Sequence, residues 1–433
     1  MRRTIRILVL VGLLHVLAPA SAQTGTNLWW RSTQGDTLFN FNNSTVVSGG
    51  HTLVFDSIPY AKEYTLIIVY HALDTVEMPL WKLTYEGGAS RGLTTRSICL
   101  DSTVISYSER TEMEPIINTL QQWAPDSTSP YVRLTIGDDA MRGRFKVSEV
   151  ICIGSRIGFG ALRRIQGPLA VRYGVTLGPV DYPDGQGRRF WHNVETYRHH
   201  VTGLGHDTTW DVHQTASRSQ VDDAVLTLGV DTLQEGDFLV CGDNDQPMRF
   251  VDSTGVELLQ RVWRVERTGC VESLFSLRFD LDSIDGGHDS VVLILDDRLI
   301  RPTSVNGSCA IFSDVPFYED TSYLTLGRGE LLWQLSATVM SHANNNGGNA
   351  SITLDGMESR VYPNPSRGNY TLEVANAEWV RATIYNALGG IVTTFEDSGK
   401  SRYNFSGSLP KGSVYYVTVT TESGSQTTKL VVK

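Results

Sequence analysis

The sequence predicts an all-β fold built mainly from β-sandwiches. Of its 433 residues, 41% are hydrophobic and only 19% are charged, a composition that fills packed cores rather than leaving the chain disordered. Runs rich in β-branched and aromatic residues, such as 64–70, 131–136 and 290–295, alternate with clusters of Gly, Asp, Asn and Ser, which is typical of strands joined by tight turns. Helical patterns are few, and we expect helices only at about 112–123 and 159–173.

Residues 1–22 have the features of a secretory signal peptide. Three arginines precede an apolar run from 7 to 17, and Ala20 and Ala22 supply the small residues of a cleavage site. The run is far shorter than the roughly 20 residues that span a bilayer. We therefore expect export from the cytoplasm and a mature chain without a transmembrane segment.

The segment 23–158 predicts a jelly-roll-like β-sandwich. Its apolar segments suit two packed sheets, and they lie at 53–55, 64–70, 80–85, 131–136 and 145–153. Four tryptophans could fill the core or stack on sugar rings, and we favour the core: Trp29, Trp30, Trp81 and Trp123. A glycan or protein ligand is compatible with such a sandwich, but a shared fold is only an analogy for function.

The segment 159–340 predicts a second β-rich domain. Its strings 169–177, 201–207 and 238–244 resemble an uncharacterised β-rich domain of secreted proteins from Bacteroidota. That domain often follows a LamG-like jelly roll, so the resemblance implies that 23–158 is LamG-like. The resemblance implies an architecture for this segment, but it implies no catalytic or binding residues.

The last two segments differ sharply in composition. Residues 341–360 are rich in Gly and Asn and poor in apolar residues, which indicates a flexible linker. Residues 361–433 alternate apolar and polar residues between Gly-bearing turns, which predicts a small Ig-like sandwich of about seven strands.

The C-terminal segment resembles the type A sorting domain of cargo proteins of the type IX secretion system. The matching residues stand in order and reach the C-terminus: Pro363, Asn364, Pro365, Gly368, Gly389, Gly412, Tyr415, Lys429 and Lys433. The resemblance implies delivery to the cell surface or the medium through the periplasm. The implied partners are the general secretory translocon and the type IX machinery, including a sortase-like peptidase that removes the module.

Two short motifs are interpreted as structural rather than catalytic. Residues 88–92 match G-x-S-x-G, but a nucleophile elbow needs a helix after the serine, and strand-like sequence follows Ser90; we expect a hairpin turn. Histidines gather between His192 and His213, with Asp207, Asp211 and Asp243 nearby, but without the tight spacing of a zinc site. We expect solvated or core histidines there.

Acidic residues leave a structural calcium ion open as an alternative to no cofactor. Asp280, Asp282 and Asp285 could supply several oxygens from one loop, although the loop does not match an EF-hand. The formal net charge of −10 and the lack of a basic cluster argue against nucleic-acid binding.

Cysteines and Asp-Ser/Thr pairs are also informative. Five cysteines in an exported chain leave at least one unpaired, and we expect one disulfide or none, with Cys152 acting as a small buried hydrophobe. Asp followed by Ser or Thr and then by a small or aliphatic residue or Thr recurs along the chain, as at Asp36, Asp56 and Asp74, which resembles the O-glycosylation acceptor pattern of exported Bacteroidota proteins. Turn chemistry explains the same pattern equally well.

The function expected from these patterns is non-enzymatic. We expect a cell-surface or secreted protein that binds a ligand or contributes to surface structure. Two alternatives stay open: a secreted glycan or peptide hydrolase with a dispersed acid pair, and a cargo protein that reports export to an envelope sensor.

Overall fold

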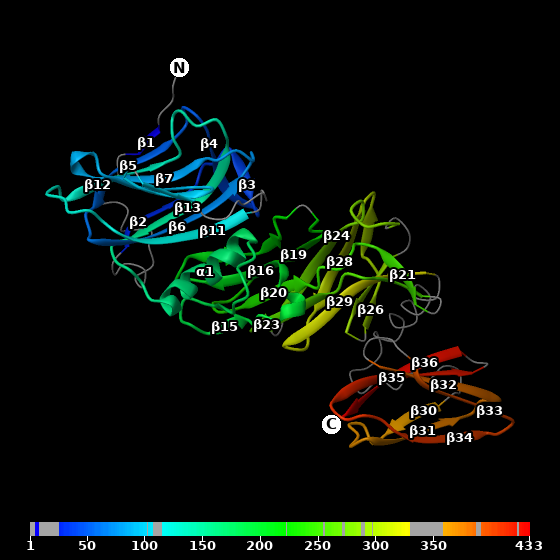
Figure 1. Ribbon diagram of the computed structural model, residues 1–433. Helices are drawn as coiled ribbons and strands as arrows, with labels where there is room; N and C mark the ends of the chain where they lie inside the picture. The colour runs from blue at the N-terminus through cyan, green and yellow to red at the C-terminus, as the bar shows by residue number, and fades with distance from the viewer. Residues whose placement is uncertain are drawn as a thin grey trace. The chain divides into compact units, whose positions relative to one another are not determined.

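The computed structural model describes most of the chain as two compact units, Met1–Ser336 and Ala337–Lys433 (Figure 1). The described residues are 5–7, 26–101, 103–106, 115–221, 223–253, 256–270, 273–286, 291–296, 298–329, 358–386, 391–421 and 424–433. The predicted cleavage residues Ala20 and Ala22, the sorting-motif residue Gly389 and linker residues 341–357 lie outside them. The described residues contain no helix that is long and apolar enough to cross a membrane.

The first unit begins with a sandwich of two sheets. The outer sheet has the order β1 (Ile5–Ile7), β5 (Leu53–Pro59), β12 (Tyr131–Ile136), β7 (Pro79–Thr84), β8 (Ser90–Thr94), β9 (Ser97–Leu100), β10 (Thr103–Ser106). The inner sheet has the order β11 (Pro115–Trp123), β6 (Glu63–Ala72), β13 (Phe145–Ile153), β4 (Asn42–Val47), β3 (Thr37–Phe39), with β2 (Thr26–Arg31) paired to β13. Except for the parallel pair β1–β5, the pairings in both sheets are antiparallel.

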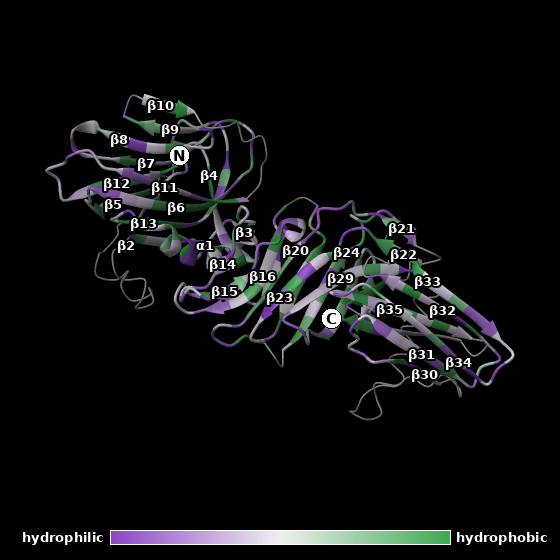
Figure 2. Ribbon diagram, turned by 60° about the horizontal axis from the view of Figure 1, so that its bottom comes forward, coloured by the Kyte–Doolittle hydropathy of each residue, from purple (hydrophilic) through white to green (hydrophobic). Residues whose placement is uncertain are grey.

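Both faces of the inner sheet are buried. Along β6, Leu66 and Ile68 point into the core between the two sheets, whereas Ile67 and Val69 pack in a second core on the opposite face. Successive residues of a strand point to opposite faces, so burial of both faces produces the nearly continuous apolar run seen in β6. Figure 2 shows hydrophobic and hydrophilic residues interleaved along many of the other strands.

The predicted helix at 112–123 is wrong. Residues Pro115–Trp123 form β11, which pairs antiparallel with the whole of β6. Ile116 and Leu120 face the sandwich core and Ile117 faces the second core. Apolar residues spaced three and four apart can thus reflect burial on two faces of a strand as well as one face of a helix.

The predicted helix at 159–173 is confirmed as α1 (Phe159–Tyr173), the single α-helix of the described residues. It ends at Gly174, whose φ of 58° places it in the left-handed region that glycine tolerates. Every residue from Ile165 to Tyr173 is buried, because the helix is covered on one side by the inner sheet and on the other by the next sheet of the chain (Figure 1).

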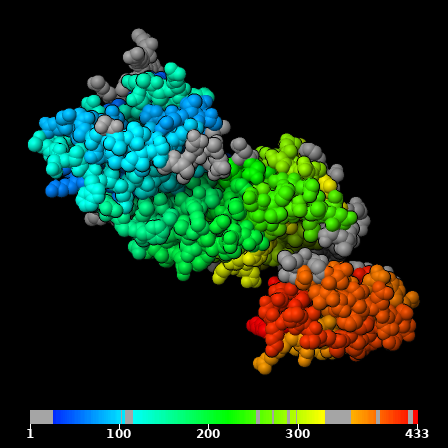
Figure 3. Space-filling view, viewed as in Figure 1, coloured from blue at the N-terminus to red at the C-terminus, as the bar shows by residue number. Residues whose placement is uncertain are grey.

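A second sandwich completes the first unit. Its large sheet has the order β17 (Val212–Gln214), β16 (His199–Asp207), β20 (Phe238–Asp243), β23 (Trp263–Thr268), β29 (Thr321–Arg328), β22 (Val256–Leu259), β21 (Phe250–Ser253), with β25 (Val291–Leu295) beside β29 and β26 (Arg298–Ile300) beside β25. Its small sheet has the order β18 (Ala216–Arg218), β19 (Leu226–Val230), β24 (Leu274–Asp280), β28 (Cys309–Pro316), β27 (Ser304–Asn306). A hairpin of β14 (Tyr182–Pro183) and β15 (Arg189–Trp191) lies beside α1, and Figure 3 shows the first unit as one continuous body.

A buried ion cluster joins the first sandwich to α1. Glu149 on β13 is fully buried; its carboxylate lies 3.3 Å from both Arg31 and Arg172 and accepts a hydrogen bond from the Tyr173 hydroxyl at 2.7 Å. The indole of Trp29 also donates to it. Burial opposes the charged form, but the two guanidinium groups and the Tyr173 hydroxyl outweigh it and lower the pKa of Glu149.

The second unit is a small sandwich of seven described strands. One sheet contains β30 (Glu358–Tyr362), β31 (Asn369–Ala375) and β34 (Arg402–Ser408); the other contains β33 (Ile391–Ser398), β32 (Trp379–Asn386), β35 (Ser413–Thr421) and β36 (Gly424–Val432). The two sheets enclose a core of Leu372, Val417, Leu430 and their neighbours. The prediction of an all-β, multi-sandwich fold is therefore confirmed.

Candidate functional site

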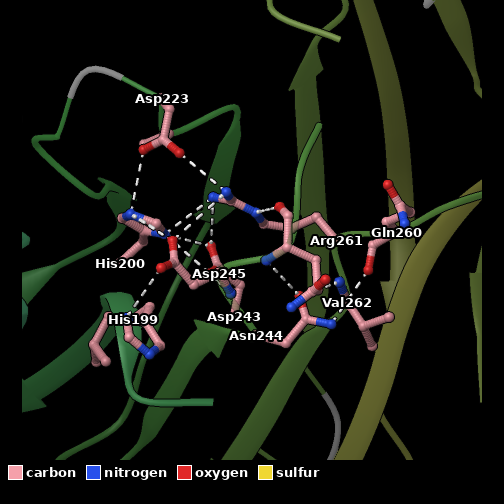
Figure 4. A network of polar contacts seen from close by, with 12 residues as sticks. His199, His200, Asp223, Asp243, Asn244, Asp245, Gln260, Arg261 and Val262 are labelled. Atoms are coloured by element: carbon pink, nitrogen blue, oxygen red, sulfur yellow. Dashed lines mark hydrogen bonds and ion pairs between the residues drawn. The ribbon is translucent and has the colours of Figure 1, made fainter. Parts of the chain in front are cut away.

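The described acidic and histidine side chains converge most closely around His200. Its ligand-type nitrogen and the carboxylates of Asp223 and Asp245 lie within 4.8 Å of one another, the only three-residue group of His, Cys, Asp or Glu in the described chain that does so (Figure 4). Buried Asp243 and Arg261 complete the cluster. We call these five residues the His200 cluster.

The backbone sets the position of His200. The pairing of β16 with β20 shifts register between His199 and Thr202, and His200 sits in this bulge with a φ of 50°. Asp243 is the last residue of β20, and Asp245 follows in the turn. Asp223 comes from the loop before β19 and Arg261 from the segment before β23, so three separate loops build the cluster.

The imidazole of His200 is held in one orientation. Its Nδ1 lies 2.8 Å from Asp243 Oδ2, which can only accept, and 3.1 Å from Arg261 Nη1, which can only donate. Its Nε2 then faces Asp223 Oδ1 at 3.2 Å and Asp245 Oδ1 at 3.9 Å. Burial lowers the pKa of His200, but the hydrogen bond and charge of Asp243 and the charge of Asp223 outweigh burial and raise it above 6.5.

The cluster is charged and partly open to solvent. Asp243 and Arg261 are almost fully buried, whereas about half of the side chains of Asp223 and Asp245 is exposed. Arg261 reaches Asp223 Oδ2 at 3.0 Å, which leaves Oδ1 facing His200. Three carboxylates against one guanidinium leave an excess of negative charge, and a divalent cation would neutralise it.

The sequence anticipated only part of this cluster. His199, His200 and Asp243 lay in the histidine-rich region, but Asp223, Asp245 and Arg261 join them only through the fold. The other histidines lie elsewhere: His192 contacts Glu266 at 3.0 Å, and the rings of His206 and His213 lie 4.7 Å apart across β16 and β17. The one local signal is the pair Asp243 and Asp245 where the apolar run 238–241 ends, and it does not point to His200.

The predicted calcium loop does not form a comparable donor group in the described residues. Asp280 ends β24, and its carboxylate accepts the backbone N–H of Asp282 at 3.3 Å. Asp285 lies farther along, where its backbone bridges to the segment at Arg249. These three carboxylates do not lie within 4.8 Å of one another, so the calcium hypothesis stays a prediction.

Two smaller predictions concern Ser90 and the cysteines. Ser90 begins β8, which forms an antiparallel hairpin with β7, so the G-x-S-x-G match is a hairpin as expected. Cys152 is buried in the sandwich core, as predicted. No two of the five cysteines are bonded to each other in the structure.

An exposed aromatic surface lies where β11 ends and α1 begins. Trp123 is 61% exposed and Phe159 is 68% exposed, and each ring is covered on one side by an arginine: Arg156 at 5.8 Å and Arg163 at 4.6 Å. We call these four residues the aromatic–arginine surface. Among the four tryptophans considered, Trp81 is in the core as favoured, Trp29 and Trp30 are half-buried, and Trp123 is not in the core.

The sorting-motif residues tie the start of the second unit to its last strand. Asn364 accepts the backbone N–H of Val431 at 2.9 Å and donates to the carbonyl of Lys429 at 2.6 Å. Lys433 N–H bonds the Ser366 carbonyl, and Gly412 N–H bonds Val432. The Tyr415 hydroxyl donates to Pro410, while Gly368 has a φ of 118°. Pro363 and Pro365 flank Asn364 in this crossing.

Two family models match the chain. Residues 161–327 match "Domain of unknown function (DUF8202)", and residues 360–433 match "Secretion system C-terminal sorting domain". Neither match reaches the N-terminal sandwich, so its LamG-like character stays a prediction. No curated protein matches the sequence.

Solved structures give only loose likenesses. A cycloisomaltooligosaccharide glucanotransferase of Paenibacillus sp., complexed with cycloisomaltoheptaose, is 10% identical with a TM-score of 0.18, over 70% of this chain and 46% of that chain. Dimeric latent PorU from Porphyromonas gingivalis is 10% identical with a TM-score of 0.15, over 85% and 29%. The binding domain of Botulinum Neurotoxin DC in complex with SialylT is 9% identical with a TM-score of 0.22, over 70% and 94%.

TM-scores this low do not support any inference about function. This chain also spans less than half of the first structure. The sorting-domain match is specific, because it covers the C-terminal module from 360 to the last residue. The chain is a cargo protein of the type IX secretion system, carried to the cell surface or the medium by its C-terminal sorting domain, with a domain of unknown function (DUF8202) before it.

Proposed function

We propose that the protein is a non-enzymatic, glycan-binding protein of the cell surface. In this proposal an acidic sugar chain binds the aromatic–arginine surface. The observation that carries it is the exposure of Trp123 and Phe159, each beneath an arginine, on a protein whose net charge is −10.

The exposed rings suit the apolar faces of sugars. Large aromatic side chains are costly to leave in water, so two exposed rings, each two residues beyond the Gln121–Ile157 hydrogen bond, indicate a binding surface. An arginine covers one side of each ring, and the high exposed fractions mean that ring surface is still open to a ligand. Flat aromatic rings supply large contact area at low cost in conformational entropy.

The arginines give the surface its preference for acidic groups. A guanidinium binds a carboxylate or sulfate through two parallel hydrogen bonds, which a neutral sugar cannot offer. Arg156 is exposed and Arg163 is half-buried, whereas the guanidinium of exposed Arg164 lies against Gly187. Glu63 is the nearby acid, and it accepts the backbone N–H of Arg156 at 3.4 Å.

The loop that presents Arg156 is held in place. The Gln121 amide donates to the carbonyl of Ile157 at 2.7 Å, and the Thr65 hydroxyl donates to that of Ser155 at 2.8 Å. Both partners belong to strands of the inner sheet. A preformed surface loses little conformational freedom on binding, which favours affinity.

The test is a calorimetric titration of the full chain with oligogalacturonate and with a neutral oligosaccharide of equal length. We expect tighter binding of the acidic chain, weakened by salt. Trp123→Ala and Arg156→Gln should each lower the affinity about tenfold, since each loses stacking area or a charge-assisted contact worth about 1.4 kcal/mol. Trp379→Ala, at a 40% exposed tryptophan of the second unit, is the matched control and should bind normally.

Equal affinity of the Trp123→Ala variant and the wild type would contradict the proposal. Hydrolysis of the sugar during the titration would contradict its non-enzymatic part.

One observation favours a second candidate, a cation-dependent hydrolase. His200 Nε2, Asp223 and Asp245 offer one nitrogen and two oxygens with spacings that two bonds of about 2.0–2.4 Å to one ion can span. Asp243 on Nδ1 matches the carboxylate that commonly orients a metal-bound histidine. A bound divalent cation there would supply a more acidic water molecule.

This alternative is tested with polysaccharide and peptide substrates in the presence of Mn²⁺, Zn²⁺ or a chelator. Activity that the chelator and His200→Ala abolish, while His213→Ala retains it, would support the hydrolase. Hydrolysis absent with every cation would remove it.

A further inference from the structure

Three side chains to which neither candidate function gives a role meet at the surface of the second sandwich: His206, His213 and Glu235. His206 belongs to β16, His213 to β17 and Glu235 to the turn before β20. His206 and His213 stand directly opposite each other in the antiparallel pair, and the centroids of their rings lie 4.7 Å apart. Directly opposite residues present their side chains on the same face of a sheet, so the two imidazoles are neighbours. We call these three residues the His206 group.

The hydrogen bonding of His206 fixes which ring nitrogen is free. Its Nδ1 lies 3.2 Å from the Leu233 carbonyl oxygen, which can only accept, so Nδ1 carries a proton and the neutral ring has its electron pair on Nε2. Nε2 faces Glu235 Oε2 at 3.9 Å, which is too far for a hydrogen bond. Two bonds of about 2.0–2.2 Å to one metal ion span that distance. A backbone carbonyl that accepts the N–H of the ring is also a common support of a metal-binding histidine.

The backbone holds Glu235 beside this electron pair. Glu235 Oε2 accepts the N–H of Thr208 at 2.9 Å. Two backbone hydrogen bonds join His206 to the turn, from Gly236 N–H to the His206 carbonyl at 2.9 Å and from His206 N–H to the Asp237 carbonyl at 3.0 Å. The electron pair and the carboxylate therefore face each other in a fixed arrangement, and a cation between them would satisfy both.

His213 offers a third ligand. The ligand atoms of the three residues do not all lie within 4.8 Å of one another, so the His213 ring has to turn toward the ion. His213 is exposed, and among the described residues the one ring contact, hydrogen bond or ion pair of its side chain is the contact with the His206 ring. Exposed side chains change rotamer within nanoseconds. The turn of the ring therefore displaces no packed neighbour.

The charged neighbours leave the carboxylate of Glu235 available to a cation. Arg188 lies against Gly236, but its Nε is held 2.8 Å from Asp184, which neutralises the guanidinium. Asp207, the residue after His206, is buried and its carboxylate accepts two backbone N–H groups. Asp207 is therefore not a ligand, and its negative charge favours a cation nearby.

We propose that the His206 group binds a zinc ion through His206 Nε2, Glu235 and the ring of His213. Two imidazoles and one carboxylate are a donor set that suits Zn²⁺, with water in the fourth position, whereas Ca²⁺ and Mg²⁺ prefer oxygen ligands. The ion would join the β16–β17 hairpin to the turn before β20. The proposal is independent of glycan binding and of the His200 cluster, because it shares no residue with either site.

The experiment titrates the chelator-treated full chain with Zn²⁺ in a calorimeter, with and without excess Ca²⁺. We expect zinc to bind and calcium not to compete. His213→Ala and Glu235→Gln should each lower the affinity at least about tenfold, because loss of even an outer partner of a metal ligand costs 10–100-fold. His51→Ala is the matched control, since the Nδ1 of His51 also lies near a backbone carbonyl, that of Val46 at 3.1 Å, and it should leave the affinity unchanged.

Thermal unfolding shows whether each variant is folded. His213 and Glu235 are exposed, so without zinc both variants should unfold at the wild-type temperature. Zinc should raise the unfolding temperature of the wild type and of His51→Ala, but not that of the two ligand variants, because an ion that binds only the folded chain stabilises it. The proposal is overturned if the wild type binds no zinc, or if His200→Ala loses zinc while His213→Ala keeps it.

Discussion

Replacing Glu149 by Gln should destabilise the first unit strongly. The side chain of Glu149 is fully buried and contacts Arg31, Arg172 and Tyr173. The change keeps the shape of the side chain but removes its charge, so both guanidinium groups lose their buried counter-ion. Arg31 keeps Asp211 at 2.5 Å, whereas among the described residues the Arg172 guanidinium keeps only the Trp210 carbonyl at 3.4 Å.

The expected loss is about 3–5 kcal/mol in the free energy of unfolding, because breaking a buried ion pair leaves an uncompensated charge in the interior. The matched control is Glu257→Gln, which removes a carboxylate that pairs with Arg328 near the surface. A pair of that kind contributes at most about 1 kcal/mol. The comparison separates burial of the charge from the loss of a carboxylate as such.

The measurement is urea denaturation followed by tryptophan fluorescence. Trp29 donates to Glu149, and the rings of Trp29 and Trp210 lie 5.7 Å apart, so both indoles report on this junction. The double variant Glu149→Gln/Arg172→Met should cost less than the sum of the two single changes, because the two side chains interact directly. A cost below about 1 kcal/mol for Glu149→Gln, or strict additivity, would refute the reasoning.

The same carboxylate predicts a dependence on pH. The pKa of Glu149 in the folded state lies below its ordinary value of 4.5. Its stabilisation is therefore complete above about pH 4.5 and is lost as the pH falls through the lower folded pKa. In the Glu149→Gln variant this part of the acid destabilisation should be missing from the stability profile.

Three further predictions concern other parts of the chain. The His200 imidazole should titrate above pH 6.5 by NMR, and its stabilisation, complete below that value, should fade as the pH rises through the raised folded pKa; Asp243→Asn should lower the midpoint, and an unmoved midpoint would count against the assigned hydrogen bond. Asn364→Ala removes two bonds to β36 and should lower the stability of the second unit by about 1–3 kcal/mol in thermal unfolding, whereas exposed Lys411→Ala should not. Deleting residues 361–433 should trap the protein in the periplasm on cell fractionation; arrival of the truncated form at the surface would contradict the sorting role.

The strands and the modules at the two ends of the chain could be predicted from the sequence, because their signals are carried by neighbouring residues. The alternation in 131–136 and the apolar run in 64–70 depend only on which neighbours face the core, and both segments are strands. The helix at 159–173 could also be predicted, because its sequence pattern and the following Gly174 lie within one continuous stretch. The segment at 112–123 failed because α1 buries the second face of β11, which the local pattern does not contain.

The candidate sites were less predictable because their parts are distant in the chain. Asp223, Asp245 and Arg261 reach His200 only after β16, β20 and β23 pair. Trp123 was grouped with core tryptophans because nothing in its neighbouring sequence marks it as exposed.

The sequence by itself determined that the chain is rich in strands and ends in a sorting domain, because strand periodicity and the sorting motif are carried by consecutive residues. The tertiary structure alone decided which charged groups lie buried together and which aromatic rings stay exposed. Burial and electrostatic pairing depend on distances between segments that are far apart in sequence. Glu149 and Arg31, 118 positions apart, show this most directly.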